Sequence, residues 1–332
     1  MVNIILDVNF WSYLADAGRE CDFARLEDEM NTMIILPPSI LLEAQKTKDK
    51  EKRIRILKAM YRAGRKTLST EADLEAEEFI NEIRRLKPEW RRAGDIRNIK
   101  RLRDFWQRKI WQTAISNTDN YHTLARDIDR PVLEGILKEQ TINKIAYEKA
   151  GWNIQKIIPS KMIGRVLESD RFVSKHYDIE KDIEPWRLNC LHYYRRCLSF
   201  KDGIDNPDNR TVLDWCEPWL KINRILDEEK DYVHFWLDEV NATNMKRNWI
   251  RWAIRSIQPF KKIGDGNPAD QQHTAYLFDA DYFFTCDRRF HACLEILNGD
   301  PLVNGMASPV LLTPNIDAAL ETIERAILAK QE

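Results

Sequence analysis

The stretch NPADQQHTAYLFDADYFFTCDRRFHACL, residues 267–294, decides the fold of this chain. Asn267 followed by Pro268 is typical of a helix N-cap and first helical position, so the sequence predicts a helix from here to about Phe278. Asp270 falls in the first turn of that helix, where unpaired backbone N–H groups favour a carboxylate. The stretch therefore predicts a helix that carries an acid at its start.

A short buried strand is predicted next, at Tyr282–Thr285, because this run is aromatic and β-branched. Asp287 follows two residues after the run. Ligands of open α/β sheets bind at the carboxyl ends of the strands, so Asp287 is a candidate site residue. Asp279 and Asp281 precede the strand and are interpreted as turn residues. Asp265 is kept as a substitute for Asp270.

The N-terminal part of the chain supplies two further acids. Asn3–Leu6 and Met33–Leu36 are apolar runs that predict strands, and Asp7 directly follows the first of them. Pro37, Pro38 and Ser39 then predict the start of a helix that carries Glu43. Four acids are expected at one edge of one parallel sheet: Asp7, Glu43, Asp270 and Asp287. Clustered carboxylates repel one another unless cations hold them, which indicates Mg²⁺ or Mn²⁺.

These pieces resemble the PIN-domain nucleases. IILDVNFW (residues 4–11) is similar to their opening strand, Asp, x, Asn, and ILPPSILLEA (35–44) to their second strand and Glu-bearing helix. Residues 267–290 resemble their Asp-bearing helix followed by strand, Thr, x, Asp, Arg, x, Phe. Residues 309–314 and 315–329 resemble their final strand and helix. The order and spacing of the four pieces carry the resemblance.

The resemblance implies an α/β fold: a PIN-like three-layer domain with a central, mainly parallel sheet. It covers residues 1–48 and 263–332. Residues 49–262 lack alternating strand signals and are rich in helix formers, so an all-helical insertion domain is expected between the two parts. Helices are predicted there at 51–63, 71–86, 96–115, 132–150, 214–230 and 231–257. The two outer parts together have the usual size of one compact domain.

The implied function is that of a metal-dependent endonuclease, a hydrolase that cuts phosphodiester bonds to leave 5′-phosphate and 3′-hydroxyl ends. Asp7 and Asp287 are expected as the main metal ligands, with Glu43 and Asp270 completing the site directly or through water. Single-stranded or structured RNA is favoured over DNA because most relatives of the pattern resemble ribonucleases. Four side chains are expected to support the chemistry: Asn9 and Thr285 by ordering the ligands, and Arg288 or Arg289 by holding a substrate phosphate.

Two basic runs in the predicted insertion are candidate nucleic-acid contacts. Residues 84–111 contain eleven basic residues against three acids, interleaved with Trp90, Trp106 and Trp111. Residues 246–262 carry six basic residues, two tryptophans (Trp249 and Trp252) and no acid. Basic grooves with aromatic platforms suit single strands. The structural alternative is that the tryptophans are core and the basic residues a solvated face. The residues proposed to touch substrate are Arg101, Arg108 and Arg251.

Composition bounds the class of protein. The chain has 332 residues, 43% of them hydrophobic, which is enough for a sizeable core. A net charge of −1 excludes a generally basic nucleic-acid binder, so any such affinity must come from local patches. Six scattered cysteines without a CxxC spacing favour reduced thiols and a cytoplasmic location. No apolar run approaches the length of a membrane span, and no signal peptide is expected.

Two other interpretations stay open at the sequence level. The first is a catalytically silent PIN-like module that binds RNA or protein; four convergent carboxylates argue against it. The second is an all-helical scaffold in which the acids are incidental, which requires that the flanking strands form no common sheet. A role for the insertion in substrate choice, self-association or binding of a partner or inhibitor is equally compatible with the pattern.

Overall fold

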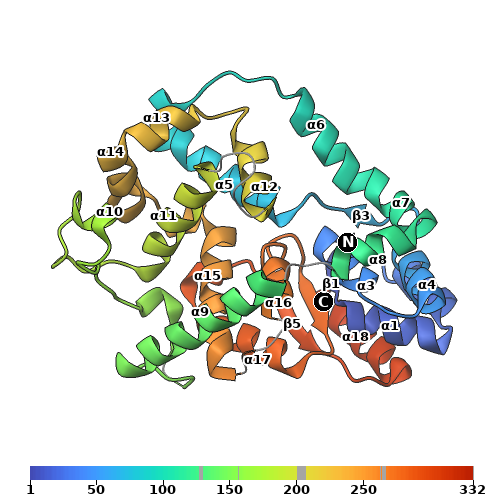
Figure 1. Cartoon of the computed structure of the whole chain (residues 1–332). Coiled ribbons are helices and arrows are strands. Elements are labelled where there is room, and N and C mark those ends of the chain that lie inside the picture. Colours follow the sequence, from blue (N-terminus) through green and yellow to red (C-terminus); the bar gives the residue numbers. More distant parts are fainter. Residues whose placement is uncertain (127–129, 156, 200–206, 262, 264–266, 332) are drawn as a thin grey trace.

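A parallel sheet of five strands lies at the centre of the protein. The computed structural model describes residues 1–126, 130–155, 157–199, 207–261, 263 and 267–331 (Figure 1). The strand order is β3-β2-β1-β4-β5, and every neighbouring pair is parallel. The strands are β1 (Val2–Leu6), β2 (Thr32–Leu36), β3 (Lys66–Thr67), β4 (Tyr282–Thr285) and β5 (Ser308–Leu311). The prediction of a mixed α/β fold with a parallel sheet is confirmed.

Helices cover both faces of the sheet, as a parallel sheet with near-continuous apolar strands requires. In β1, Ile4, Ile5 and Leu6 are all buried. Figure 1 shows α1, α4 and α18 together on one side, and α16 and α17 on the other. The helices nearest the sheet are α1 (Val8–Ala17), α2 (Glu20–Glu29), α3 (Pro38–Gln45), α4 (Lys50–Met60), α16 (Asn267–Thr274), α17 (Arg288–Leu297), the short η6 (Pro301–Val303) and α18 (Ile316–Gln331).

Most helices between residues 71 and 261 form a second, helical lobe at the left and top of Figure 1, whereas α7 and α8 lie at the right and pack on α3 and α4. The core of the lobe is rich in aromatic side chains; Phe79, Tyr194 and Trp236 stack on one another. The helices of this segment are α5 (Glu71–Leu86), η1 (Pro88–Trp90), α6 (Arg97–Asp104), the π-helical η2 (Phe105–Lys109), α7 (Ile110–Ser116), α8 (Thr118–Arg126), α9 (Arg130–Lys149), η3 (Pro159–Lys161), α10 (Arg171–Ser174), α11 (Pro185–Leu198), α12 (Pro207–Cys216), α13 (Ile222–Asp227), α14 (Glu229–His234), the π-helical η4 (Phe235–Glu239), η5 (Ala242–Asn244) and α15 (Lys246–Lys261).

The expectation of an exclusively helical segment 49–262 is wrong at β3. Lys66 and Thr67 pair with Ile35 and Leu36 and extend the sheet by one strand. A two-residue strand with one lysine carries no hydrophobic signal, so periodicity could not indicate it. Helix α4 also packs on α1. The sheet-bearing unit therefore continues beyond residue 48.

Several predicted helices end or break earlier than expected, and the 51–63 helix is one of them, since α4 ends at Met60. The predicted 214–230 helix is two helices, α12 and α13, because Pro218 interrupts it. The predicted 231–257 helix consists of α14, η4, η5 and the first part of α15. Helix α16 ends at Thr274, where its hydrogen bonds shorten to i→i−3 at Ala275, Tyr276 and Leu277.

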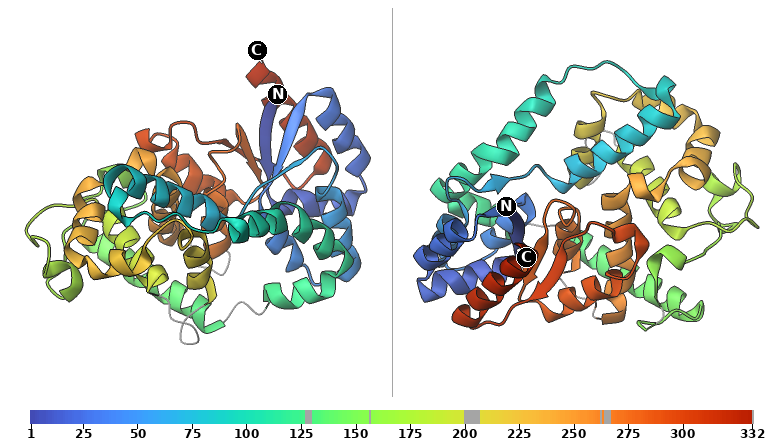
Figure 2. Two further views of the ribbon diagram at one scale, coloured as in Figure 1. Left: turned by 90° about the horizontal axis from the view of Figure 1, so that it is seen from above. Right: turned by 180° about the vertical axis from the view of Figure 1, so that it is seen from behind.

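Helices α6 and α7 run along the outside of the protein from the helical lobe to the sheet, and the views from above and behind agree (Figure 2). The Thr67 hydroxyl, at the end of β3, donates a hydrogen bond to the Gln107 carbonyl of η2. Gln45 of α3 likewise donates to the Ala114 carbonyl of α7. These contacts fix the α6–α7 segment at the carboxyl edge of the sheet.

Both chain ends lie beside each other near the sheet (Figures 1 and 2). Gln331 donates a hydrogen bond to the Met30 carbonyl, and Lys330 pairs with Asp281. Across the described ranges, no helix is both long and apolar enough to span a membrane.

Candidate functional site

The carboxyl edge of the sheet has a topological switch point between β1 and β4. From β1 the chain proceeds to β2 and β3 on one side, and β4 and β5 occupy the other side. Leu6 is in register with Phe284, so Asp7 and Thr285 follow at the same level. In open α/β sheets, ligands bind in the crevice at such a point. The candidate site is built around it.

Asp7 is buried between the ends of β1 and β4. Its Oδ1 accepts the backbone N–H of Phe10 at 3.0 Å, which caps α1. Its Oδ2 accepts the Thr285 hydroxyl and the backbone N–H of Cys286, the latter at 2.9 Å. Burial raises the pKa of the Asp7 carboxyl; these hydrogen bonds oppose the rise, and the nearby charge of Glu43 adds to it. Asp7 is thus also the N-cap of α1.

Asp287 also caps a helix, at the start of α17. Its Oδ1 accepts the backbone N–H groups of Arg289 at 2.6 Å and Phe290 at 2.9 Å. The Asp287 backbone N–H in turn donates to the Thr285 hydroxyl at 2.9 Å. Unlike Asp7, the Asp287 side chain is exposed. The hydroxyl of Thr285 thus joins Asp7 to the backbone of Asp287.

Glu43 is held by a histidine that the sequence did not single out as a site residue. Nε2 of His273, on α16, lies 2.9 Å from Oε2 of Glu43, and Nδ1 lies 2.8 Å from the Ser39 hydroxyl. His273 and Ser39 are both buried, whereas the Glu43 side chain is 32% exposed. Burial raises the pKa of Glu43, but the hydrogen bond and charge of His273 outweigh it and lower that pKa. For His273, burial lowers the pKa, and Glu43 more than reverses the effect.

Asp270 lies in the first turn of α16, close enough to two of the other acids for their charges to affect its pKa. Burial raises the pKa of its carboxyl to about 7; His273 opposes the rise, and the charges of Asp287 and Glu43 increase it. The Gln258 side chain of α15 donates to Oδ2 of Asp270 at 3.0 Å. The Gln271 side chain donates to the side-chain oxygen Oε1 of Gln258 at 2.9 Å. Of the polar residues that break the apolar pattern of α16, Gln271 therefore supports Gln258, the partner of Asp270, and His273 contacts Glu43.

The four predicted acids are brought into one electrostatic cluster, but they do not form a ready-made metal cage. Within the described ranges, no group of three or more His, Cys, Asp or Glu residues is arranged to hold one metal ion. Three of the carboxylates nevertheless keep one oxygen with no hydrogen bond from the described part of the chain: Oε1 of Glu43, Oδ1 of Asp270 and Oδ2 of Asp287.

The other predicted supporting residues are exposed. Asn9 lies in the first turn of α1 with an exposed side chain. Arg288 and Arg289 open α17 beside Asp287 and are exposed as well. Asp281, at the opposite edge, accepts the backbone N–H of Asn3 at 2.9 Å, in agreement with its interpretation as a turn residue. Asp265, the substitute for Asp270, lies outside the described residues.

The tryptophans of the two basic runs are mostly core residues, which corrects the expectation of aromatic platforms. Trp90, Trp111, Trp249 and Trp252 are buried. Trp106 is partly exposed. A tryptophan at helical spacing buries a large apolar area, and this stabilises the fold more than a solvent-exposed ring would.

Arg251 is not available to a substrate as predicted. Its guanidinium lies 2.5 Å from Oε2 of the buried Glu75 and 3.2 Å from the Tyr193 hydroxyl. The guanidinium also stacks over the Tyr193 ring at 4.2 Å. Burial of the carboxyl raises the pKa of Glu75 to about 8 in spite of Arg251. Arg251 therefore has a structural partner inside the helical lobe.

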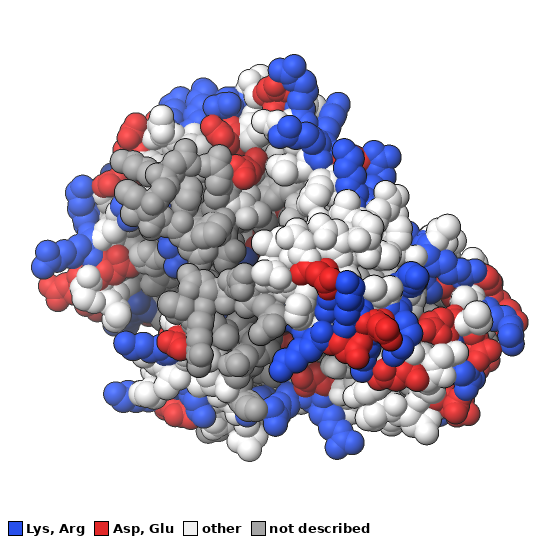
Figure 3. Space-filling view, turned by 45° about the vertical axis from the view of Figure 1, so that its right-hand side comes forward, with Lys and Arg blue, Asp and Glu red and all other residues white. Residues whose placement is uncertain are grey.

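The first basic run is accessible. Arg101 on α6 and Arg108 on η2 are exposed, and Arg108 pairs with Asp104. In the described part of the chain, Lys100 and Arg101 have no ion pair or hydrogen bond from their side chains. Figure 3 shows lysine and arginine side chains gathered along the upper rim of the molecule, the side on which α6 lies in Figure 1. The α6–α7 segment at the carboxyl edge of the sheet thus exposes positively charged side chains.

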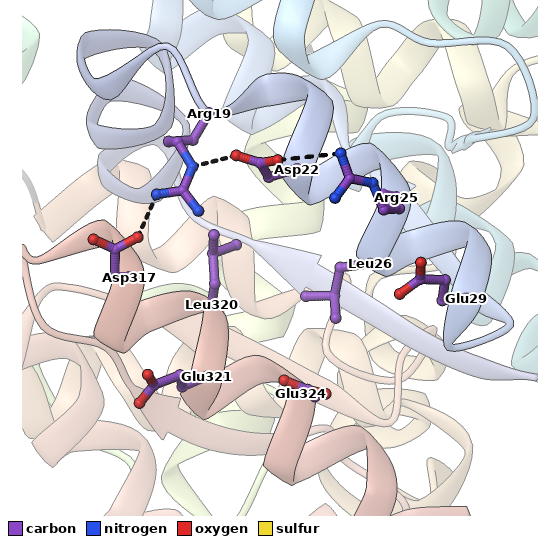
Figure 4. Close-up of a pocket in the computed structure, with 9 residues that line it drawn as sticks. All are labelled: Arg19, Asp22, Arg25, Leu26, Glu29, Asp317, Leu320, Glu321 and Glu324. Atoms are coloured by element: carbon purple, nitrogen blue, oxygen red, sulfur yellow. Dashed lines mark hydrogen bonds and ion pairs between the residues drawn. The ribbon is translucent and has the colours of Figure 1, made fainter.

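A groove of about 290 Å³ lies elsewhere, between α2 and α18 (Figure 4). Leu26 and Leu320 line it together with acidic side chains, and Arg19 links Asp22 to Asp317. None of its lining residues belongs to the predicted site. Most of its charged lining is acidic, which disfavours a nucleic-acid phosphate.

Comparison with known proteins assigns the chain to no family. No family model matches the chain, and neither the curated proteins nor the solved structures contain a match.

Proposed function

We propose that the protein is a PIN-like, metal-dependent nuclease that hydrolyses phosphodiester bonds in RNA. One observation carries the proposal: acids from four separate segments converge at the switch point of a parallel sheet. Asp7 and Asp287 follow adjacent strands, and their neighbours Glu43 and Asp270 lie on α3 and α16. Carboxylates that raise one another's pKa destabilise the fold unless a ligand compensates, which is typical of functional sites.

The donor set fits a hard divalent cation such as Mg²⁺ or Mn²⁺. All four side chains offer carboxylate oxygens, the ligands that these ions prefer. In Glu43, Asp270 and Asp287 one oxygen is oriented by the protein, and the other accepts no hydrogen bond from the described residues. A bound cation would supply Lewis-acid stabilisation of the phosphoryl group and a water of lowered pKa. Movement of these side chains toward one another must accompany binding, since no three described side chains ligate one ion as they stand.

The remaining roles follow from position. Thr285 fixes the Asp7 carboxylate and the backbone of Asp287. Arg288 and Arg289 are exposed next to Asp287, where they can hold a substrate phosphate. Arg101 and Arg108 lie on the basic segment at the same edge of the sheet and suit the phosphates of a longer strand.

Cleavage of mixed single-stranded RNA and DNA oligonucleotides tests the proposal. The parent protein is expected to cut RNA with Mn²⁺ or Mg²⁺, and D7N and D287N are expected to lose the activity. D281N is the matched control, because Asp281 lies at the opposite edge of the sheet. Cutting by D7N at the parent's rate, or no cutting by the parent together with no rise of its Tm in Mn²⁺, contradicts the proposal.

A second candidate is a PIN-like module that binds RNA or protein without cutting. It is favoured by the hydrogen bonds that already occupy Oδ1 of both Asp7 and Asp287 as helix caps. It is also favoured by the lack, within the described ranges, of a preformed three-ligand group. RNA binding by the parent that is independent of Mn²⁺, without product formation, would select this candidate.

A further inference from the structure

His273 connects two helices that come from distant parts of the chain. It lies on α16, and both of its ring nitrogens reach α3, through Glu43 and Ser39. These are its partners at sequence separations of 230 and 234 residues. A buried imidazole with both nitrogens engaged has a fixed ring orientation. It therefore transmits the position of α16 to the Glu43 side chain.

The protonation of the ring follows from the partners. A carboxylate only accepts hydrogen bonds, so Nε2 of His273 carries a proton and donates it to Oε2 of Glu43. In the neutral ring, Nδ1 then accepts the Ser39 hydroxyl. In the protonated ring, Nδ1 instead donates to the Ser39 oxygen, so hydrogen bonds connect Ser39, His273 and Glu43 in either protonation state. This contact holds Oε2 of Glu43, while Oε1 accepts no hydrogen bond from the described residues.

Serine, histidine and glutamate are also the residue types of a hydrolase triad, but the geometry disfavours that interpretation. Ser39 has 4% of its surface exposed and lies inside the first turn of α3. A nucleophilic serine must reach a substrate carbonyl, and the acidic groove described above lies between α2 and α18 instead. A role in orienting Glu43 requires no access to substrate.

We infer that His273 is a positioning residue that fixes Glu43 as a cation ligand, with Ser39 fixing His273. The inference rests on the proposed function. Partners that orient ligating side chains raise metal affinity, and their removal typically costs about 10- to 100-fold. Gln258 has the equivalent contact with Asp270. Glu43 is thus oriented from α16, and Asp270 is oriented from α15.

Calorimetric titration of the full-length protein with Mn²⁺ alone, well below its Tm, tests the inference without any substrate. H273A is expected to weaken Mn²⁺ binding about 10-fold or more. H273Q keeps an amide N–H that can donate to Glu43 and is expected to restore most of the affinity. S39A is expected to weaken binding less than H273A. H176A is the matched control, because His176 pairs with Glu229 inside the helical lobe.

A double-mutant cycle separates positioning from a general loss of structure. If His273 acts through Glu43, H273A in the E43Q background causes no further loss of affinity. Equal Mn²⁺ affinity of the parent and H273A overturns the positioning role while the proposed function stands. Additive losses in the double variant also overturn it. No Mn²⁺ binding by the parent overturns the proposed nuclease function and, with it, the role of His273.

Discussion

The Thr285 hydroxyl donates a hydrogen bond to Oδ2 of Asp7 and accepts one from the backbone N–H of Asp287. One side chain thus links the ends of β1 and β4 to the start of α17. Thr285 is fully buried, so both bonds are shielded from water. Because Asp7 is buried as well, its carboxylate depends on such donors for its solvation.

Replacing Thr285 with valine keeps the shape of the side chain and removes the hydroxyl. We expect T285V to lower the free energy of unfolding by about 1.5–3 kcal/mol, because a buried carboxylate loses a hydrogen bond. T285S keeps the hydroxyl and is expected to lose less. Urea denaturation at pH 7 measures both. Equal stability of T285V and the parent would contradict the proposed dependence of Asp7 on Thr285.

The raised pKa of Asp270 predicts a pH dependence of stability. The folded protein holds the Asp270 proton up to about pH 7, whereas an unfolded chain releases it near the ordinary value of 3.8. Between these values the folded state binds more protons, so stability falls as pH rises from about 4 to 7, by up to about 1.4 kcal/mol per pH unit. Above pH 7 this contribution is constant.

Thermal unfolding of the parent and D270N across this range measures the effect in the absence of metal. D270N has no proton to lose, so its advantage over the parent should grow from pH 4 to pH 7. At pH 8 we expect D270N to have a higher Tm than the parent. A residue kept for function commonly lowers the stability of the fold in this way. Parallel curves for the two proteins would contradict the raised pKa of Asp270.

Arg251 provides a contrast, because its partner is structural. We expect R251M to lower stability by about 3–5 kcal/mol at pH 9, where Glu75 is ionised and would be left buried without its cation. At pH 6 the loss should be smaller, because Glu75 then holds a proton. Urea denaturation at the two pH values measures this. A variant of full stability with weakened RNA binding would restore a substrate role for Arg251.

The central part of the fold is predictable because its signals are local. The strands at Asn3–Leu6, Met33–Leu36 and Tyr282–Thr285 are runs of buried apolar residues, and the sequence predicts each within a residue of its bounds. Asp7 directly follows one such strand and Asp287 comes two residues after another, so parallel pairing brings them to one edge. The helix Glu71–Leu86 is predicted at its observed ends because it is a run of helix formers, and in the structure Thr70 caps it.

What the sequence does not reveal depends on interactions between distant residues. His273 breaks the apolar pattern of its helix, and only the fold shows that its ring forms hydrogen bonds with Ser39 and Glu43. The sequence assigns Arg251 to substrate because its partner Glu75 lies 176 positions earlier in the chain. The spacing of Trp90 and Trp249 fits a core face and an exposed face equally well, and burial decides for the core.

The basic side chains of α6 and η2 are expected to contribute unequally to RNA binding, so removal of single charges should weaken binding to different extents. Arg101 has no ion-pair partner among the described residues, whereas Arg108 is already paired with Asp104. A phosphate bound by Arg101 releases a counterion, so R101A should weaken RNA binding and reduce the slope of log Kd against log salt by about 0.7. R108A should have a smaller effect, since Asp104 neutralises part of its charge.

The salt dependence of RNA binding also locates the strand on the surface of the protein. Binding is measured with D287N, which is expected not to cut the RNA, at several salt concentrations. R165A is the control, because Arg165 is paired with Glu180 and Asp182 in the helical lobe. We expect R165A to leave the slope unchanged, since its charge is already compensated on the protein. If R165A and R101A change the slope equally, RNA does not bind along α6, and its phosphates must be held elsewhere on the protein.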